Sequence, residues 1–321
     1  MINNILTSVR LTKTSAVSKS IYSLISIFVV LQMGMSIVSW RKISLQSDDR
    51  TEQVKFDGTR ALRDVEHQVS LGPRIPGSDG HDQIVDWMVS ELESMDWSVE
   101  IQTTERLGNP IKNVIARREG KDQSSNSWII LGAHYDTRIY ADQDPNPEFR
   151  TQPVPGANDG ASGVAVLLEL SRVLPSDIEQ DVWLVFFDAE DNGRIPGWDW
   201  ILGSRAFVES LEGKPDAAVI VDMIGDTDLE IYLERGSDPE LSAEIWDVAA
   251  LLGYSQFIPT HKYHVLDDHV PFLEAGIPAV DIIDFDYPYW HTIEDTLDKV
   301  SAQSLEAVGE TLRIWLLERN P

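Results

Sequence analysis

The chain has 321 residues, of which 42% are hydrophobic, so it is long enough to bury a large core in one or two domains. Its 53 acidic and 26 basic residues give a formal net charge of −27. This excess of carboxylates disfavours a nucleic-acid-binding surface, because contacts to phosphate need clustered Lys and Arg; we expect no DNA or RNA partner. Cysteine is absent, which excludes disulfides and thiolate ligands, so any metal site must consist of His, Asp and Glu.

The first hydrophobic segment, residues 21–40, contains no charged residue and is long enough to span a bilayer as a helix. Basic residues precede and directly follow it, and no small-residue cleavage motif is evident. An uncleaved signal anchor is therefore favoured over a signal peptide and over a buried core helix. Residues 1–20 form an N-terminal arm and residues 41–55 a polar linker in this interpretation. We expect the body, residues 56–321, to be anchored at a membrane through residues 21–40 or exported, and to lie outside the cytoplasm.

The body alternates between two kinds of segment. Apolar residues at helical spacing predict helices, and short apolar runs bounded by turn formers predict strands. Strands separated by helices favour an α/β fold, in which helices cover both faces of a mixed, mostly parallel central sheet. The expected helices are residues 59–67, 81–95, 163–174, 204–211, 270–275 and 301–319, and the expected strands are residues 98–103, 113–117, 127–133, 182–187, 217–224 and 278–283.

One predicted strand, residues 182–187, ends abruptly in carboxylates. The sequence DVWLVFFDAEDNG passes from an apolar run to Asp188, Glu190 and Asp191. In an open α/β sheet, ligands bind beyond the carboxyl ends of the strands, so these acids are candidates for chemistry. For this stretch considered alone, the alternative is a polar turn after a core strand.

Four further segments repeat this pattern of an apolar or turn element that ends in His or Asp: LGAHYDTR, PGANDGASG, VIVDMIGD and YWHTIED. Each alone is more often structural, but together they resemble a ligand set. Imidazole and carboxylate are the ligands of a thiol-free zinc site. Asp159, in a glycine-containing turn, could bridge two ions if they lie ~3.5–4 Å apart. The candidate residues of these segments are His134, Asp136, Asp159, Asp222 and His291.

These motifs, in this order, resemble those of the zinc aminopeptidase superfamily, which also contains the animal glutaminyl cyclases. The resemblance covers roughly residues 71–300 and implies that residues 56–321 are a zinc-dependent catalytic domain acting on peptide or protein N-termini. In the aminopeptidase branch, Glu190 would be the general base, and Asp136 would orient a ligand imidazole. One zinc ion would be held by His134, Asp159 and Asp222, and a second by Asp159, Asp191 and His291.

Other segments are closer to the glutaminyl cyclase branch, namely RIPGS, GSR, DDHVPF and WHT. That branch implies Glu190 as the proton carrier, with Asp222 and Asp267 hydrogen-bonded to it or to the substrate. Two features depart from it: the segment GANDGASG is closer to the aminopeptidase form, and Asp191 stands where Glu is usual. The single zinc ion of this branch would be held by Asp159, Asp191 and His291.

The resemblance leaves three functions open. The first is a zinc-dependent glutaminyl-peptide cyclotransferase, which converts N-terminal glutamine to pyroglutamate and releases ammonia. The alternative is a zinc aminopeptidase, which would use the same residues to hydrolyse N-terminal residues from peptides. A non-catalytic ectodomain is the third, and it would be expected to lack ligands or the base, none of which is missing here. Ligand positions alone do not separate cyclisation from hydrolysis, because both branches keep similar residues.

Aromatic and acidic residues near these motifs have secondary predicted roles. Trp198, Trp200, Tyr289 and Trp290 are close in sequence to the acidic loop or to His291. Trp198 or Trp200, together with Trp290, is expected to form the wall of a pocket for a compact substrate; core packing is the alternative. The carboxylates of Asp142 and Asp144, in an insertion after HYDTR, are expected to be solvated loop charges. No feature of the sequence indicates an oligomeric state.

Overall fold

The computed structural model of the protein describes residues 54–121 and 127–319. The predicted N-terminal arm (1–20), the predicted membrane segment (21–40) and all but the end of the predicted linker (41–55) lie outside these residues. Within the described ranges, no helix is both long and apolar enough to cross a membrane.

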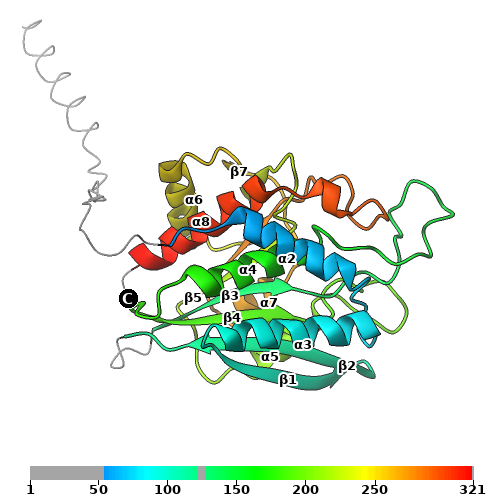
Figure 1. The fold of residues 1–321 in the computed structure, drawn as a ribbon, viewed down its shortest axis with the longest axis horizontal. Helices are drawn as coiled ribbons and strands as arrows, with labels where there is room; N and C mark the ends of the chain where they lie inside the picture. The colour runs from blue at the N-terminus through cyan, green and yellow to red at the C-terminus, as the bar shows by residue number, and fades with distance from the viewer. Residues whose placement is uncertain (1–53, 122–126, 320–321) are drawn as a thin grey trace, which may run out of the picture. The chain divides into compact units, whose positions relative to one another are not determined.

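A six-stranded sheet with the order β1-β2-β4-β3-β5-β8 runs through the described residues (Figure 1). The pairings β1/β2 and β2/β4 are antiparallel, whereas β4/β3, β3/β5 and β5/β8 are parallel. The predicted mixed, mostly parallel sheet is therefore confirmed. The strands are β1 (Ser98–Arg106), β2 (Asn109–Arg118), β3 (Trp128–His134), β4 (Asp181–Phe187), β5 (Ala217–Asp222) and β8 (Ala279–Ile283).

Helices cover both faces of this sheet, as the sequence predicted. Successive side chains of a strand point to opposite faces, and on β3 Ile129 and Leu131 belong to one hydrophobic cluster whereas Ile130 belongs to the other. The larger cluster contains residues of α2, α3, α4, α6 and α8, and the smaller one contains residues of α5 and α7 (Figure 1). The helices are α2 (Gly58–Ser70), α3 (Asp79–Ser94), α4 (Ala161–Val173), α5 (Leu202–Glu209), α6 (Pro239–Leu252), α7 (Val270–Glu274) and α8 (Ala302–Glu318).

The region between β5 and α7 contains one helix and two strands that were not predicted from the sequence. Helix α6 has local signals at both ends: the Asp238 side chain accepts hydrogen bonds from two N–H groups of the first turn, Pro239 follows it, and Gly253 ends the helix with φ 84°. The strands β6 (Ile231–Leu233) and β7 (Phe257–His261) form a separate two-stranded parallel sheet beside it.

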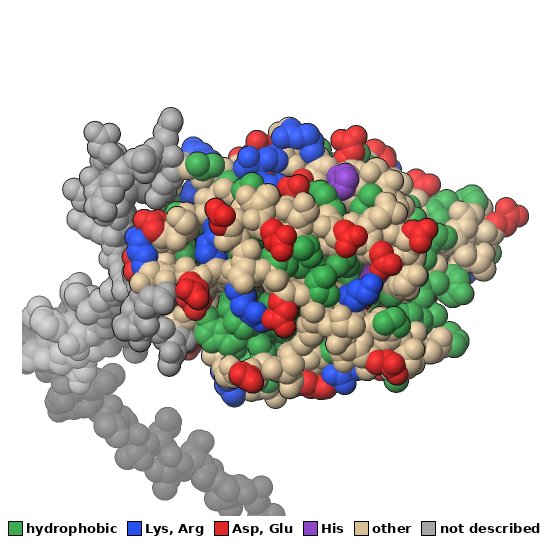
Figure 2. Space-filling view, turned by 60° about the horizontal axis from the view of Figure 1, so that its bottom comes forward, with side chains coloured by type: hydrophobic (Ala, Val, Ile, Leu, Met, Phe, Trp, Pro, Cys, Tyr) green, Lys and Arg blue, Asp and Glu red, His purple; other side chains and the backbone are tan. Residues whose placement is uncertain are grey.

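The outer surface of the described residues is rich in charge. Strand β1 is an edge of the sheet, and most of its residues are exposed or half-buried. Figure 2 shows acidic side chains spread over one face of the molecule, with basic side chains between them. Charged side chains on an edge strand disfavour pairing with another chain.

The topology gathers the predicted site at one edge of the sheet. Strands β4, β3, β5 and β8 are parallel neighbours, so their carboxyl ends meet at the same edge. Strand β3 ends at His134, β5 ends at Asp222, and Asp188 directly follows β4. The loops that leave these strands bring together side chains that are far apart in the sequence.

Candidate metal centre and active site

The Asp159 carboxylate lies between two histidine rings. Its Oδ1 atom is 3.1 Å from Nε2 of His134, and its Oδ2 atom is 3.8 Å from Nε2 of His291. Nε2 of His134 is also 3.1 Å from Oδ1 of Asp222, and Nε2 of His291 is 2.7 Å from Oδ1 of Asp191. These contacts define two groups of three potential ligands that share Asp159, and within each group the ligand atoms lie within 4.8 Å of one another.

The chemistry of these two groups fits zinc. Both consist of buried imidazole and carboxylate, which are the ligands that a zinc site without cysteine uses. Oδ2 of Asp159 and Oδ2 of Asp191 are buried and have no hydrogen-bond partner. A buried carboxylate oxygen without a partner is costly, and a bound cation would satisfy it.

Asp295 fixes the position of Asp159. Its carboxylate accepts hydrogen bonds from the backbone N–H groups of Asn158 (2.8 Å) and Asp159 (3.2 Å), and the Tyr287 hydroxyl donates to it at 2.7 Å. Burial, together with the charge of Asp159, raises the pKa of Asp295 to about 7. Asp295 was not among the residues predicted from the sequence, although it follows the WHT motif closely.

Arg74 holds the other side of the same loop. It is fully buried and donates hydrogen bonds to the carbonyl oxygens of Pro155 (2.7 Å), Gly156 (2.6 Å) and Tyr135 (3.3 Å). Burial lowers the pKa of Arg74 to about 10, so the guanidinium is still protonated at neutral pH. Its position gives a structural role to the RIPGS segment, which the sequence alone marked only by its similarity to glutaminyl cyclases.

Asp136 binds the loop that follows β4. Its carboxylate accepts hydrogen bonds from the backbone N–H groups of Glu190 (3.0 Å) and Asp191 (3.3 Å) and from the Asn192 amide (3.1 Å). It also lies 3.5 Å from Nδ1 of His134, in the position expected for a carboxylate that orients a ligand imidazole. Asp136 therefore connects the predicted ligand His134 to the loop that carries the predicted base.

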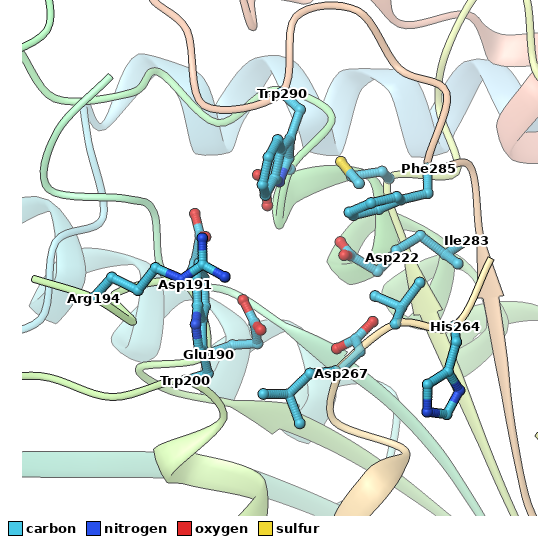
Figure 3. A pocket seen from close by; sticks show the side chains of 14 residues that line it. Glu190, Asp191, Arg194, Trp200, Asp222, His264, Asp267, Ile283, Phe285 and Trp290 are labelled. Atoms are coloured by element: carbon cyan, nitrogen blue, oxygen red, sulfur yellow. The ribbon is translucent and has the colours of Figure 1, made fainter. Parts of the chain in front are cut away.

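Glu190 is buried at the beginning of this loop and points toward the same space as Asp222 and Asp267 (Figure 3). Burial raises the pKa of Glu190 well above its usual value, and the charges of Asp191 and Asp267 raise it further, although His134 opposes them. Burial likewise raises the pKa of Asp222 to about 7. The site therefore contains a carboxyl group that can hold a proton at neutral pH.

A cavity of about 200 Å³ opens beside Glu190 (Figure 3). The ring of Trp290 stacks on His291 with the centroids 3.7 Å apart, and Trp200 stacks on the same histidine at 6.0 Å. Trp198 packs beside Leu202 in a small hydrophobic cluster and does not line the cavity, contrary to its predicted place, whereas Trp200, the other tryptophan considered there, does line it. The residues that line the cavity are Asp159, Glu190, Asp191, Arg194, Trp200, Asp222, Met223, His264, Val265, Leu266, Asp267, Ile283, Phe285 and Trp290.

Asp142 and Asp144 contradict the prediction of solvated loop charges. Oδ1 of Asp142 lies 3.6 Å from Nδ1 of His291, and its carboxylate accepts hydrogen bonds from Arg138 at 2.7 and 2.9 Å. Although burial opposes them, the contacts with His291 and Arg138 hold the pKa of Asp142 well below its usual value. Asp144 is buried and accepts a hydrogen bond from the backbone N–H of Ile293 at 3.2 Å. The insertion folds back onto the WHT segment, which the linear sequence does not indicate.

A third buried group of potential ligands includes the cavity residue Asp267. It consists of Asp267, His269 and Asp281, whose potential ligand atoms lie within 4.8 Å of one another. His269 directly precedes α7, and its Nδ1 atom is 3.7 Å from Oδ2 of Asp281. Burial raises the pKa of Asp281 well above its usual value, and the charge of Asp267 raises it further. The group therefore places the buried His269 and Asp281 next to Asp267, which lines the cavity.

The site is also a place of unusual backbone conformation. Among the described residues, Ala189 (φ 52°), Met223 (φ 48°) and His291 (φ 56°) adopt the left-handed region, which residues other than glycine rarely occupy. Ala189 precedes Glu190, Met223 follows Asp222, and His291 is itself a predicted ligand. Such conformations persist only where the surrounding structure enforces them.

Comparisons with known proteins identify relatives of the chain. Residues 113–316 match the model of peptidase family M28. The chain is 35% identical to Porphyromonas gingivalis glutaminyl cyclase, with 82% of this chain and 99% of that one covered and a TM-score of 0.77. It is 28% identical to a Zn-dependent exopeptidase from Parabacteroides distasonis, with 83% and 100% covered and a TM-score of 0.77. Its identity to the glutaminyl-peptide cyclotransferase of Drosophila melanogaster is 25%, over 94% of this chain and 91% of the relative.

The fold and the site are those of a zinc-dependent α/β enzyme. More narrowly, the chain belongs to peptidase family M28, and the predicted resemblance to zinc aminopeptidases and glutaminyl cyclases is confirmed. Since both kinds of relative are enzymes, the alternative of a non-catalytic ectodomain is set aside.

Proposed function

We propose that the protein is a glutaminyl-peptide cyclotransferase, which closes an N-terminal glutamine to pyroglutamate and releases ammonia. The observation that carries this proposal is the match to 99% of the P. gingivalis glutaminyl cyclase at 35% identity. The site is compatible with it, because a buried proton carrier, Glu190, lies beside a cavity small enough for a single compact residue.

The reaction joins the α-amino nitrogen of glutamine to its side-chain carbonyl carbon and breaks the bond from that carbon to the amide nitrogen. When bound, zinc supplies a Lewis acid that polarises the amide carbonyl. Glu190 accepts a proton from the attacking amine and returns it to the departing ammonia, so it acts first as base and then as acid. Its raised pKa suits both roles. Asp267, across the cavity from Glu190 (Figure 3), accepts a hydrogen bond from the α-amino group.

The residues that would hold zinc in this enzyme are Asp159, Asp191 and His291. In that case His134 and Asp222 need no ion, because Nε2 of His134 lies at hydrogen-bonding distance from Oδ1 of Asp222, 3.1 Å. A stoichiometry of one zinc per chain in the purified protein, measured by inductively coupled plasma mass spectrometry, is the expected result.

The second candidate is a zinc aminopeptidase. It is favoured by the complete second group, His134, Asp159 and Asp222, and by the similarity to a Zn-dependent exopeptidase. With two ions bound, Glu190 would serve as the general base for the attack of water on the peptide bond.

One experiment separates the two functions. The purified, zinc-loaded protein is incubated with the dipeptides Gln-Ala and Leu-Ala, and the products are separated by mass. Pyroglutamyl-Ala with free ammonia is the expected result. Release of leucine and alanine, without any cyclised product, would show that the protein is an aminopeptidase and would make two zinc ions the working stoichiometry.

We also propose that residues 21–40 anchor the enzyme in a membrane with the catalytic body outside the cytoplasm. The uncharged apolar run of that segment supports the proposal. Fractionation of cells that express the full chain should find the protein in the membrane pellet, and a protease added outside the cytoplasm should digest the body. A soluble, protected protein would contradict it.

A further inference from the structure

Arg194 is the single Lys or Arg among the residues that line the cavity, and five of the others are carboxylates. Its side chain is exposed, and Figure 3 shows it on the side of the cavity where Glu190 and Asp191 lie. None of the ion pairs between described residues includes Arg194. The guanidinium is thus at the cavity without a carboxylate partner in an otherwise acidic site.

The backbone presents Arg194 from a rigid turn. Its φ of 64° is left-handed, a conformation that costs free energy for any residue other than glycine. The buried Arg138 holds the preceding backbone by donating hydrogen bonds to the carbonyl oxygens of Asp191 (2.8 Å) and Gly193 (3.2 Å). A side chain at Gly193 would lie 2.1 Å from the Trp200 ring, so this ring closes over the turn. The buried Arg138 and the Trp200 ring therefore fix the backbone position from which the Arg194 side chain extends.

The mouth of the cavity is where a peptide must continue after its first residue. Beside Arg194, the exposed lining residues are Leu266, which is 50% exposed, and His264, whose ring bonds to Glu234 at 3.1 Å. A peptide whose N-terminal residue reaches Glu190 must leave past these side chains. Of the three, Arg194 has an unpaired charge and a planar fork of donors that matches a carboxylate.

We propose that Arg194 forms a subsite for a carboxylate on the residue that follows the N-terminal glutamine, so that peptides with Glu or Asp in second position are preferred substrates. The C-terminal carboxylate of a glutaminyl dipeptide presents the same chemistry. This inference rests on the proposed cyclisation of N-terminal glutamine. Without Arg194, the cavity carboxylates and the net charge of −27 would repel such substrates.

The test compares matched peptides. The full-length, zinc-loaded enzyme is assayed for ammonia release from Gln-Glu amide and Gln-Gln amide, which differ in one side-chain charge, and from Gln-Ala and Gln-Ala amide, which differ in the main-chain carboxylate. In the pair whose carboxylate binds Arg194, we expect kcat/KM to be about threefold to tenfold higher for the charged peptide than for the neutral one, because an exposed Arg–carboxylate contact is worth on the order of 1 kcal/mol. The difference should appear mainly as a lower KM. The two pairs show which carboxylate is bound.

Variants connect this preference to the residue. Arg194→Gln should remove the preference, and Arg194→Lys should keep part of it, since the charge remains but the fork is lost. Arg63→Gln, which removes an exposed Arg on α2 that does not line the cavity, is the matched control and should leave the preference unchanged. The preference of the wild type should fall as salt is raised, because exposed charges are screened.

The outcomes separate this inference from the function on which it rests. Equal kcat/KM within both peptide pairs for the wild type, or a preference that survives Arg194→Gln, would overturn the subsite while cyclisation stands. Failure of the wild type to cyclise any of the four peptides would instead overturn the proposed function and the subsite with it.

Discussion

The Asp136 carboxylate accepts a hydrogen bond from the backbone N–H of Glu190 at 3.0 Å. Asp136 follows β3, whereas Glu190 follows β4, so this bond joins the ends of two adjacent parallel strands. The same carboxylate lies 3.5 Å from Nδ1 of His134. A single side chain thereby sets the relative position of the proposed proton carrier and a predicted zinc ligand.

Replacing Asp136 by Asn should lower kcat about 10- to 100-fold, because Asp136 positions the backbone of Glu190 and a small displacement of a catalytic group has a cost of this order. The amide keeps one acceptor oxygen but turns N–H groups toward the loop, which displaces Glu190. Circular dichroism should show a folded protein, and KM should change less than kcat. The control is Asp181→Asn: Asp181 accepts from the backbone N–H of Gly120 at 2.6 Å, at the opposite end of β4. An unchanged kcat in Asp136→Asn would refute the positioning role.

Glu190→Gln should reduce turnover by about 10²- to 10⁴-fold, since Gln cannot carry the proton. Zinc content should stay at the wild-type level, because Glu190 belongs to neither ligand group. Steady-state assays on a glutaminyl peptide and metal analysis of the same sample check both statements. Retained activity would show that another residue transfers the proton.

His291→Ala should lose zinc, since Nε2 of His291 is a potential ligand atom of the group with Asp159 and Asp191. His264→Ala is the matched control: this histidine also lines the cavity, but it belongs to neither ligand group and bonds to Glu234. Metal analysis after dialysis should find zinc in His264→Ala and a large loss from His291→Ala. If the two variants retain equal zinc, the ligand set is misassigned.

Because Asp284 is buried, the free energy of unfolding should decrease as the pH rises. Burial raises its pKa to about 7, although backbone N–H groups of Glu230 and Asp286 donate to it at 3.0 Å. The folded protein therefore holds this proton more tightly than the unfolded chain, in which an Asp has a pKa of about 3.9. The stabilisation is complete below about pH 4 and is lost progressively as the pH rises to about 7.

Asp284→Asn removes this titration. Relative to the wild type, the free energy of unfolding of the variant should increase by about 2–3 kcal/mol between pH 5 and pH 8. Urea unfolding of both proteins at the two pH values measures the change. Parallel stability curves for wild type and variant would contradict the prediction.

Much of this fold was predictable because its signals are local. The apolar run of β4 and the periodic apolar residues of α4 and α8 follow directly from the sequence, and the structure places these elements within a few residues of the expected bounds. Helix α6 was missed although Asp238 and Gly253 mark its ends. The ligand candidates were predictable because each follows a strand or a turn at the carboxyl edge of the sheet.

The supporting residues were not predictable, because their roles depend on contacts between distant segments. Asp295 binds the backbone of Asn158 across 137 positions of the sequence, and Asp142 approaches His291 only because the insertion folds back. The choice between Trp198 and Trp200 depended on which way the turn after Asp191 faces. No periodicity or motif in the linear chain encodes that direction.

The left-handed backbone at Ala189, Met223 and His291 limits how the active site can be transferred to another protein. A peptide with the sequence DAEDNG, or a foreign loop into which it is grafted, would relax to the conformations that its residues prefer. The catalytic arrangement is consequently a property of four parallel strands and the side chains that brace their ends. An engineer who wishes to move it to another scaffold must move that edge of the sheet as a unit.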